Sequence, residues 1–346
     1  MRRGPVLDGI PFLRAGREEL AAEALARQEV GDEEGALVLL LADQDDWWTG
    51  PRADPAALRE LVRRRDSLSL REAMALLSWG PVADYFAHRW SDPTFLAGLA
   101  LVEAHAPAPE SVFELACGIG HHLRAQRQRG ARVTGADVVF AKLWVARHWV
   151  VPEATLLCLD AAQPWPELGR FDLVCCHDAF YFLEPKPAIL QRLRALGGML
   201  AISHVHNSDW PNLSAGRAMT AAEVASMFPG ATIYDDAELT RALAEGRAPE
   251  SRPAAALAGA EAFSLVEGAG PARPVRGLPH DGAALRRNPL YGSDGRLTWP
   301  SERYALEYGP RATFPATSAA PARAVLDAAT EAPARRRELL DLPERW

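Results

Sequence analysis

The stretch "SVFELACGIGHH", Ser111 to His122, joins a run of apolar residues to a short turn that contains two glycines. The run is typical of a buried β-strand, and the residues that follow the turn, "HHLRAQRQR", have helical spacing. In doubly wound sheets a ligand lies beyond the carboxyl ends of the strands, where such a turn meets it. Small residues let the backbone approach a ligand, and the start of a helix offers free N–H groups. The turn therefore predicts a site for a nucleotide-like cofactor.

The chain around this turn alternates between short apolar runs and helical patterns. The apolar runs cover residues 111–117, 131–137, 154–160, 171–178 and 197–205, with two further candidates at 231–236 and 262–268. Helical patterns separate several of them, at residues 121–129, 141–149 and 186–196, and a helix capped by Thr220 follows the fifth run. Strands that are apolar throughout and alternate with helices predict an α/β fold, in which a parallel sheet is covered on both faces.

Three regions are expected along the chain. Residues 1–80 form a helical region, in which Asp32 and Asp54 cap helices at their N-termini. Residues 81–268 form the α/β core. Residues 269–346 form a C-terminal extension that is rich in proline, glycine and arginine and ends in a predicted helix, "PARRRELLDL". Four aromatic residues indicate that this extension packs against another part of the chain, namely Tyr291, Trp299, Tyr304 and Tyr308.

The composition is that of an ordinary globular protein, since 48% of the 346 residues are hydrophobic and 24% are charged. The formal net charge of −7 argues against a nucleic-acid partner or an anionic membrane surface. No apolar stretch approaches the roughly 18–20 residues of a membrane span, and the N-terminus lacks the apolar run of a signal peptide. The four cysteines lack zinc-ligand spacing and are expected to be buried, reduced thiols. We therefore expect a cytoplasmic protein.

The glycine pattern can be compared with the fingerprint of dinucleotide-binding proteins, G-x-G-x-x-G, whose last glycine allows close packing of helix and strand. Counted from Gly118, the last position is Leu123, and counted from Ala116 it is His121. Neither register fits the fingerprint. The mismatch counts against an NAD-dependent oxidoreductase, which is kept as the alternative enzyme class.

The segment "FELACGIG" resembles the first motif of class I S-adenosylmethionine-dependent methyltransferases, commonly an acidic residue followed by G-x-G-x-G. Here Glu114 is the acid, Gly118 and Gly120 hold two glycine positions, and Ala116 replaces the first glycine. Later segments resemble the following strands of that family in the same order, namely "ARVTGAD", "LLCLDAAQPWP", "FDLVCCHDAFYFLEP" and "LRALGGMLAISHV". The resemblance covers about residues 85–267. It implies a doubly wound, seven-strand Rossmann-like sheet with an antiparallel last strand.

The resemblance also implies which residues hold the cofactor, S-adenosylmethionine. Asp137 is expected to accept from the ribose hydroxyls and Asp160 from the adenine amine. Glu114 is expected to orient the turn and the ammonium end of the cofactor. Arg89, four residues after Tyr85 in a predicted helix, is expected to pair with the cofactor carboxylate, and the equal alternative is that this helix only docks on the core through an amphipathic face. The full set of expected cofactor contacts is Tyr85, Arg89, Glu114, Ala116, Cys117, Gly118, Gly120, Asp137, Val138, Asp160, Ala161 and His177.

Histidines follow several of the predicted strands and are expected to line the same crevice. The pKa of histidine lies close to neutral pH, which suits it to remove a proton from a hydroxyl or an amine. His204 and His206 in "AISHVHN" are the expected catalytic bases, because the fifth strand of the family ends near the transferred methyl group. A divalent metal held by these two residues and Asp178 is conceivable, but the ligand set is incomplete and no metal site is expected. The alternative for each histidine is a polar loop residue without a catalytic role.

We therefore expect an enzyme that transfers a methyl group to an O or N nucleophile of a small-molecule acceptor, of sugar or secondary-metabolite type. The N-terminal helices, the segment 207–219 and the C-terminal extension are expected to build the acceptor site, because the shared core lacks them. Phe180, Tyr181 and Phe182 lie near the expected rim, although packing between sheet and helix is favoured for the two phenylalanines. The alternative from another class is a module that binds S-adenosylmethionine without catalysis.

Overall fold

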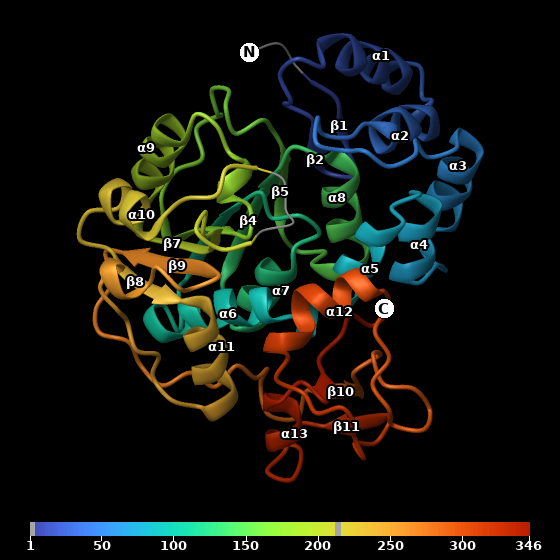
Figure 1. Cartoon of the computed structure of the whole chain (residues 1–346). Coiled ribbons are helices and arrows are strands. Elements are labelled where there is room, and N and C mark those ends of the chain that lie inside the picture. The colour runs from blue at the N-terminus through green and yellow to red at the C-terminus, as the bar shows by residue number, and fades with distance from the viewer. Residues whose placement is uncertain (1–3, 212–215) are drawn as a thin grey trace.

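The computed structural model describes residues 4–211 and 216–346. Its main element is a seven-stranded sheet in the order β5-β4-β3-β6-β7-β9-β8 (Figure 1). The strands span Ser111–Leu115 (β3), Arg132–Asp137 (β4), Thr155–Cys158 (β5), Phe171–His177 (β6), Gly197–His206 (β7), Thr232–Asp235 (β8) and Ala262–Glu267 (β9). β9 runs antiparallel to both of its neighbours, and the other pairs are parallel. The predicted α/β fold, with its doubly wound seven-strand sheet and antiparallel last strand, is confirmed.

Helices cover both faces of this sheet. They span Pro93–His105 (α6), His121–Gln128 (α7), Phe140–Val145 (α8), Lys186–Leu196 (α9), Ala221–Met227 (α10) and Asp236–Glu245 (α11). The apolar side chains of α6, α7, α8 and α11 share one hydrophobic cluster, and those of α9 and α10 belong to a second cluster on the other face. α6 is apolar on nearly all sides because it lies between the sheet and α11.

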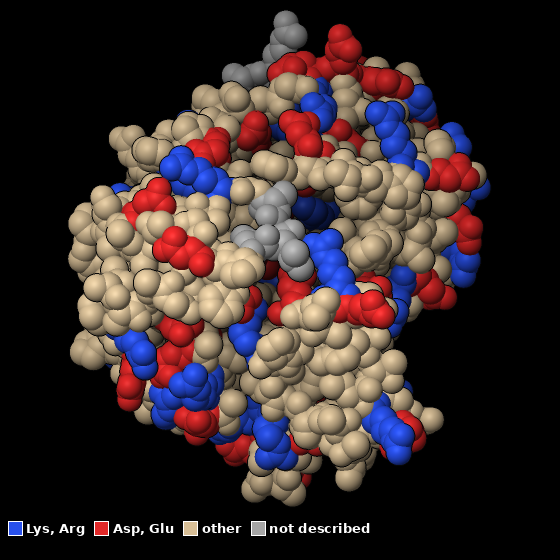
Figure 2. Space-filling model, in the orientation of Figure 1, with Lys and Arg blue, Asp and Glu red and all other residues tan. Residues whose placement is uncertain are grey.

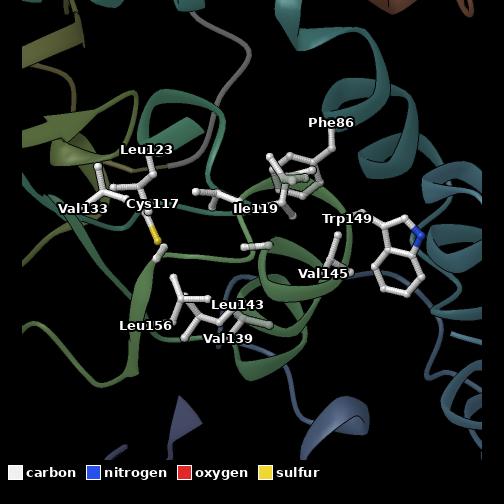
Figure 3. Packing of buried hydrophobic residues seen from close by; sticks show 14 of the residues in the cluster. Phe86, Cys117, Ile119, Leu123, Val133, Val139, Leu143, Val145, Trp149 and Leu156 are labelled. Atoms are coloured by element: carbon white, nitrogen blue, oxygen red, sulfur yellow. The ribbon is translucent and has the colours of Figure 1, made fainter. Parts of the chain in front are cut away.

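The turn after β3 depends on backbone conformations that favour glycine. Gly118 and Gly120 have φ angles of 55° and 84°, and Ala116 shares the left-handed region with a φ of 57°. A side chain at Gly120 would bring its Cβ atom within 2.8 Å of Val151. Ile119 is fully buried and points into the apolar residues around α8 (Figure 3). The side chain of Ile119 therefore anchors the turn in the hydrophobic core. The backbone of the turn remains free to face a ligand on the opposite side.

Leu123 stands where a dinucleotide fingerprint would require glycine. Its space is provided by Gly135 in β4, where a Cβ atom would lie 2.4 Å from Cδ1 of Leu123 and 2.7 Å from Sγ of Cys117. Helix α7 thus approaches the sheet because the small residue lies in the neighbouring strand and not in the turn. The packing supports the conclusion that the dinucleotide fingerprint does not fit this chain.

The N-terminal part of the chain is largely helical and packs against α8 (Figure 1). Its helices span Glu18–Glu29 (α1), Glu33–Ala42 (α2), Pro55–Arg64 (α3), Leu70–Leu76 (α4) and Pro81–His88 (α5). Asp32 and Asp54 cap α2 and α3 as predicted, because each carboxylate accepts a hydrogen bond from a backbone N–H of the first turn. The short hairpin of β1 (Val6–Leu7) and β2 (Ile10–Pro11) was not predicted.

The C-terminal extension forms a second, three-stranded sheet and two short helices. These elements are β10 (Ala284–Arg287), α12 (Glu302–Tyr308), β11 (Arg323–Val325), α13 (Glu331–Arg335) and β12 (Leu339–Leu340). The predicted helix over residues 333–342 is therefore confirmed only for residues 333–335, because α13 ends at Arg335. Arg337 has a φ of 65°, which breaks the helix, and the leucines that follow are buried by pairing with β10. The last residue, Trp346, donates from Nε1 to the carbonyl of Ala87 at 2.8 Å, so the extension returns to the end of α5.

The surface and the cysteines agree with the sequence-based expectations. Positive and negative side chains are interspersed over the face shown in Figure 2, which also has a hollow near its centre. All four cysteines are buried and free of disulfide bonds. Within residues 4–211 and 216–346, every helix is too short or too polar to cross a lipid bilayer.

Candidate active site

A cavity of about 760 Å³ lies beyond the carboxyl ends of the strands. It is lined by residues that follow β3, β4, β5, β6 and β7, together with α5, α12 and the loops around residues 14–17 and 44–48. Of the predicted site residues, these line the cavity: Tyr85, Arg89, Glu114, Ala116, Cys117, Gly118, Asp137, Val138, Asp160, Ala161, His177, His204 and His206. Gly120, the residue before helix α7, lies outside the lining. The site predicted from the sequence is thus assembled in one place.

Asp137 connects the end of β4 to the glycine turn. Its Oδ2 atom accepts a hydrogen bond from the backbone N–H of Gly118 at 2.9 Å, and its Oδ1 atom accepts one from Val139, also at 2.9 Å. The side chain is buried, and Nζ of Lys142 lies 3.9 Å from Oδ1. A carboxylate offers about four acceptor positions, so two remain for hydroxyl groups of a ligand. These features fit the expected contact with a ribose.

Asp160 and Ala161 lie in a loop after β5 that is held by several hydrogen bonds. Oδ1 of Asp160 accepts from the backbone N–H of Ala162 at 2.8 Å. The carbonyl of Ala161 accepts from Nε1 of Trp165 at 3.1 Å and from Nη1 of Arg192 at 2.8 Å. The carbonyl therefore faces the protein, and the loop is fixed before any ligand arrives.

Glu114 is buried inside the sheet, at the edge of the cavity. Burial raises the pKa of its carboxyl group to about 8, although the nearby charge of Arg89 acts in the opposite direction. Glu114 is consequently largely protonated at neutral pH. A cationic group placed beside it would favour the ionised form, so Glu114 is suited to meet the ammonium group of a ligand.

Tyr85 and Arg89 converge on Asp178, which follows β6. The Tyr85 hydroxyl donates to Oδ2 of Asp178 at 2.9 Å, and Nη1 of Arg89 donates to the same atom at 3.0 Å. The same Nη1 atom also contacts Thr94 and lies 3.5 Å from Oδ2 of Asp92. Burial alone would raise the pKa of Asp178, but the charges of His204 and Arg89 outweigh it and lower the pKa to about 2. The positive charge of Arg89 thus already compensates the negative charges of Asp92 and Asp178.

His204 and His206 lie at the end of β7, where the strand pairing shifts between Ile202 and Val205. His204 has a φ of 57°, an unfavourable conformation that tends to occur at functional sites. Its Nδ1 atom is 2.6 Å from Oδ2 of Asp236, and its Nε2 atom is 3.9 Å from Oδ1 of Asp178. Asp236 is a partner that the sequence analysis missed. Its segment, "ATIYDD", was interpreted as a strand, whereas Asp236 begins helix α11.

The side chains of Asp178, His204 and His206 also have the composition of a metal site, and their ligand atoms lie within 4.8 Å of one another. Both oxygens of Asp178 are already engaged, since Oδ1 accepts from the Tyr181 hydroxyl at 2.9 Å and Oδ2 from Tyr85 and Arg89. The guanidinium of Arg89 would repel a divalent cation bound at the same carboxylate. We therefore interpret Asp178 as the acceptor of hydrogen bonds from Tyr85, Arg89 and Tyr181, with the two histidine rings beside it. The absence of a metal stays a prediction.

His177 has a different environment from the two histidines of β7. Its Nδ1 atom is 2.7 Å from the hydroxyl of Ser203, and its ring stacks on His122 with centroids 3.8 Å apart. Burial lowers the pKa of His177 to about 3, so the ring is neutral. His177 is suited to border a bound cofactor without exchanging protons with it.

A comparison with models of known protein families finds a match within the seven-stranded sheet. Residues 112–197, which contain the glycine turn, Asp137 and Asp160, match the model of a methyltransferase domain. This part of the chain is therefore similar to a methyltransferase domain. The match and the strand order agree with the methyltransferase family that the sequence predicts. A comparison with curated proteins finds no match.

Several solved structures are similar to parts of the chain. CalS10, an amino pentose methyltransferase from Micromonospora echinaspora, is 24% identical, with 34% of this chain and 52% of that chain covered and a TM-score of 0.29. DesVI from Streptomyces venezuelae is 22% identical, with coverages of 34% and 53% and a TM-score of 0.29. The 1,6-didemethyltoxoflavin-N1-methyltransferase from Burkholderia thailandensis is 20% identical, with coverages of 67% and 98% and a TM-score of 0.38. The chain thus spans about half the length of the first two, and none of these values assigns it an acceptor.

Proposed function

We propose that the protein transfers a methyl group from S-adenosylmethionine to an O or N nucleophile of a small-molecule acceptor, of sugar or secondary-metabolite type. The observation that carries this proposal is that one cavity is lined both by Gly118, Asp137 and Asp160 and by His204 and His206. When bound, S-adenosylmethionine supplies a methyl group on a sulfonium ion that is open to in-line displacement. The chain would align the acceptor, exclude water and remove a proton.

The acceptor end of the cavity is built by parts of the chain outside the sheet. Trp47 of the N-terminal region lines it, and the Trp47 ring lies 5.4 Å from that of Phe182. From the C-terminal extension, α12 contributes Tyr304 and Tyr308, which are both buried. The buried hydroxyl of Tyr304 has no hydrogen-bond partner within the protein. An unpaired buried hydroxyl is costly, so Tyr304 is suited to bind a polar group of a ligand.

The regions 1–80 and 269–346 are accordingly proposed to determine the acceptor, around a catalytic core at 81–268. The third segment expected at the acceptor site, residues 207–219, has less structural support. Residues 212–215 lie outside the described residues, and the described remainder of the segment does not line the cavity.

Titration calorimetry with S-adenosylmethionine, S-adenosylhomocysteine and NAD tests the proposal directly. We expect the first two to bind at micromolar concentration and NAD to give no heat, because Leu123 occupies the place of the last fingerprint glycine. A screen of hydroxyl and amine acceptors with the same protein then tests turnover. Binding of NAD alone would contradict the proposal, and cofactor binding without turnover of any acceptor would favour the non-catalytic module.

Glu114 gives this titration a second readout. The pKa of Glu114 is about 8 in the free protein, so the group is protonated at pH 7. The cofactor ammonium favours the ionised form, and binding of S-adenosylhomocysteine at pH 7 is expected to release on the order of one proton. The number of protons follows from the binding heats in two buffers of different ionisation enthalpy.

Glu114→Gln is expected to abolish this proton release, because glutamine resembles the protonated acid and cannot ionise. Glu267→Gln is the matched control, since Glu267 lies at the surface in a pair with Arg194. Equal heats in both buffers for the unmodified protein would show that Glu114 does not meet the ammonium group.

A further inference from the structure

His204 is held from two sides by residues that the sequence analysis did not connect with it. Its Nδ1 atom is 2.6 Å from Oδ2 of Asp236, a residue that is 1% exposed and begins helix α11. The other oxygen of Asp236 accepts a hydrogen bond from the hydroxyl of Ser264 in β9 at 2.6 Å. The oxygen of that hydroxyl accepts in turn from the backbone N–H of His204 at 3.1 Å. Asp236 and Ser264 therefore fix both the ring and the backbone of His204.

The orientation of the ring follows from these contacts. Asp236 and Ser264 lie outside the cavity lining, whereas His204 and Asp178 belong to it. Nδ1 faces Asp236, and Nε2, the other ring nitrogen, lies 3.9 Å from Oδ1 of Asp178. With Nδ1–H bonded to a carboxylate, the neutral ring carries a free lone pair on Nε2, directed towards the cavity.

We propose that Asp236 is a positioning residue that holds His204 in its Nδ1–H form, and that Nε2 of His204, and not His206, removes the proton of the acceptor. This inference rests on the proposed methyl transfer. In that step the lone pair of the acceptor oxygen or nitrogen forms a bond to the methyl carbon. The carbon–sulfur bond breaks, and its electrons remain on sulfur. The acceptor proton passes to Nε2, and the resulting imidazolium returns it to solvent.

His206 is less suited to the same task. Its Nε2 atom is buried without a hydrogen-bond partner, and its ring packs against Tyr181 with centroids 4.4 Å apart. Burial lowers the pKa of His206 to about 4, and the charge of His204 acts in the same direction. A ring with so low a pKa is a weak proton acceptor.

The charged groups around His204 make it the stronger base. Burial by itself lowers the pKa of His204, but Asp178 from the loop after β6 and Asp236 from α11 outweigh this effect and raise the pKa. Arg311, from the C-terminal extension, opposes them, and His206 lies beside the ring on the same strand. An imidazolium formed at His204 during the reaction would thus be stabilised by two carboxylates.

Asp236→Asn, with Asp235→Asn as its control, tests the inference. In the Asp236→Asn variant the side-chain amide donates to Nδ1, so the ring proton moves to Nε2 and the lone pair is lost from the cavity side. We expect kcat to fall by about 10²- to 10⁴-fold. Binding of S-adenosylhomocysteine should remain unchanged. Asp235 caps the same helix through Ala237 and asparagine also caps well, so the control should retain full activity.

The pH profile separates positioning from a merely structural role. For the unmodified enzyme, kcat/KM is expected to rise with pH along a limb centred above pH 6.5, because the pKa of His204 is raised from that value. Removal of the Asp236 charge lowers this pKa, so the residual activity of Asp236→Asn should follow a limb at lower pH. His204→Asn should abolish turnover, whereas His206→Asn should reduce turnover without abolishing it. An Asp236→Asn variant as active as its control, or loss of turnover in His206→Asn alone, would overturn the inference.

A spectroscopic measurement extends the test to protein that has no identified acceptor. The short Nδ1–H bond to Asp236 should give a low-field imidazole proton resonance in the unmodified protein and in Asp235→Asn, and none in Asp236→Asn. If Asp236→Asn fails to fold, the pKa of His204 is measured by NMR titration of the unmodified protein, and a value at or below 6.5 contradicts the inference. Failure of cofactor binding in calorimetry would instead refute the proposed function, with the resonance still present.

Discussion

Replacement of Asp137 by asparagine is expected to weaken binding of S-adenosylhomocysteine on the order of 100-fold. The carboxylate accepts hydrogen bonds from Gly118 and Val139, each at 2.9 Å, and is proposed to accept from the ribose as well. Asparagine has no negative charge, and its amide nitrogen cannot accept a hydrogen bond. At least two of the charge-assisted bonds to this side chain, each of about 1.5 kcal/mol or more, are therefore lost or weakened. A loss of about 3 kcal/mol corresponds to roughly a 100-fold change in Kd.

The control for this experiment is Asp172→Asn, at the opposite end of the sheet. Asp172 also binds backbone N–H groups through its carboxylate, those of Glu110 at 3.0 Å and Ser111 at 2.9 Å, but it lies far from the cavity lining. This variant should lower stability and leave the Kd of S-adenosylhomocysteine unchanged. If Asp137→Asn binds as tightly as the control, Asp137 does not hold the ribose.

The residues that the sequence placed at the site are those fixed by strand periodicity. Asp137 ends one apolar run and Asp160 lies just beyond another, and parallel strands end at the same edge of a sheet, so both must lie near the glycine turn. The turn itself could be predicted because its glycines are needed locally, whatever the rest of the fold does. The strand order was implied by the resemblance to a family and not by the strand patterns alone.

The parts that escaped prediction depend on contacts between distant segments. Asp236 reaches His204 only after β8 and β9 have paired beside β7, a contact that no local pattern reports. Tyr304 lies in a seven-residue helix that reaches the cavity because the extension folds back to α5. Leu339 and Leu340 follow a helical pattern in sequence, but pairing with β10 overrides it. The proposed acceptor site is built from such contacts, and this explains why the core was easier to predict than the residues around an acceptor.

Replacement of Arg89 by methionine is expected to reduce the free energy of unfolding by about 3–5 kcal/mol. The Arg89 and Asp178 side chains are only 6% and 9% exposed, and Nη1 lies 3.0 Å from one oxygen of Asp178. Methionine fills much of the volume of arginine but leaves Asp178 and Asp92 buried without their shared cation. Urea denaturation followed by circular dichroism measures the loss.

Arg194→Met provides the matched comparison, since Arg194 pairs with Glu267 at 2.6 Å but is 41% exposed. Exposed pairs contribute about 0–1 kcal/mol, so this variant should unfold nearly as the unmodified protein does. Equal decreases in the free energy of unfolding of Arg89→Met and Arg194→Met would show that the ion pairs of Arg89 stabilise the fold no more than an exposed pair does.

The loss of stability on acidification should also distinguish Arg89→Met from Arg194→Met. The pKa of Asp178 is lowered to about 2 from 3.8, so its contribution is fully present above pH 3.8 and is lost as the pH falls towards 2. Without Arg89, burial raises this pKa and the carboxyl group takes up its proton at higher pH. Arg89→Met should therefore unfold at a higher pH than Arg194→Met on acidification. Because Tyr85 and His204 share the same carboxylate, the residue that stabilises this end of the fold also holds the proposed base in place.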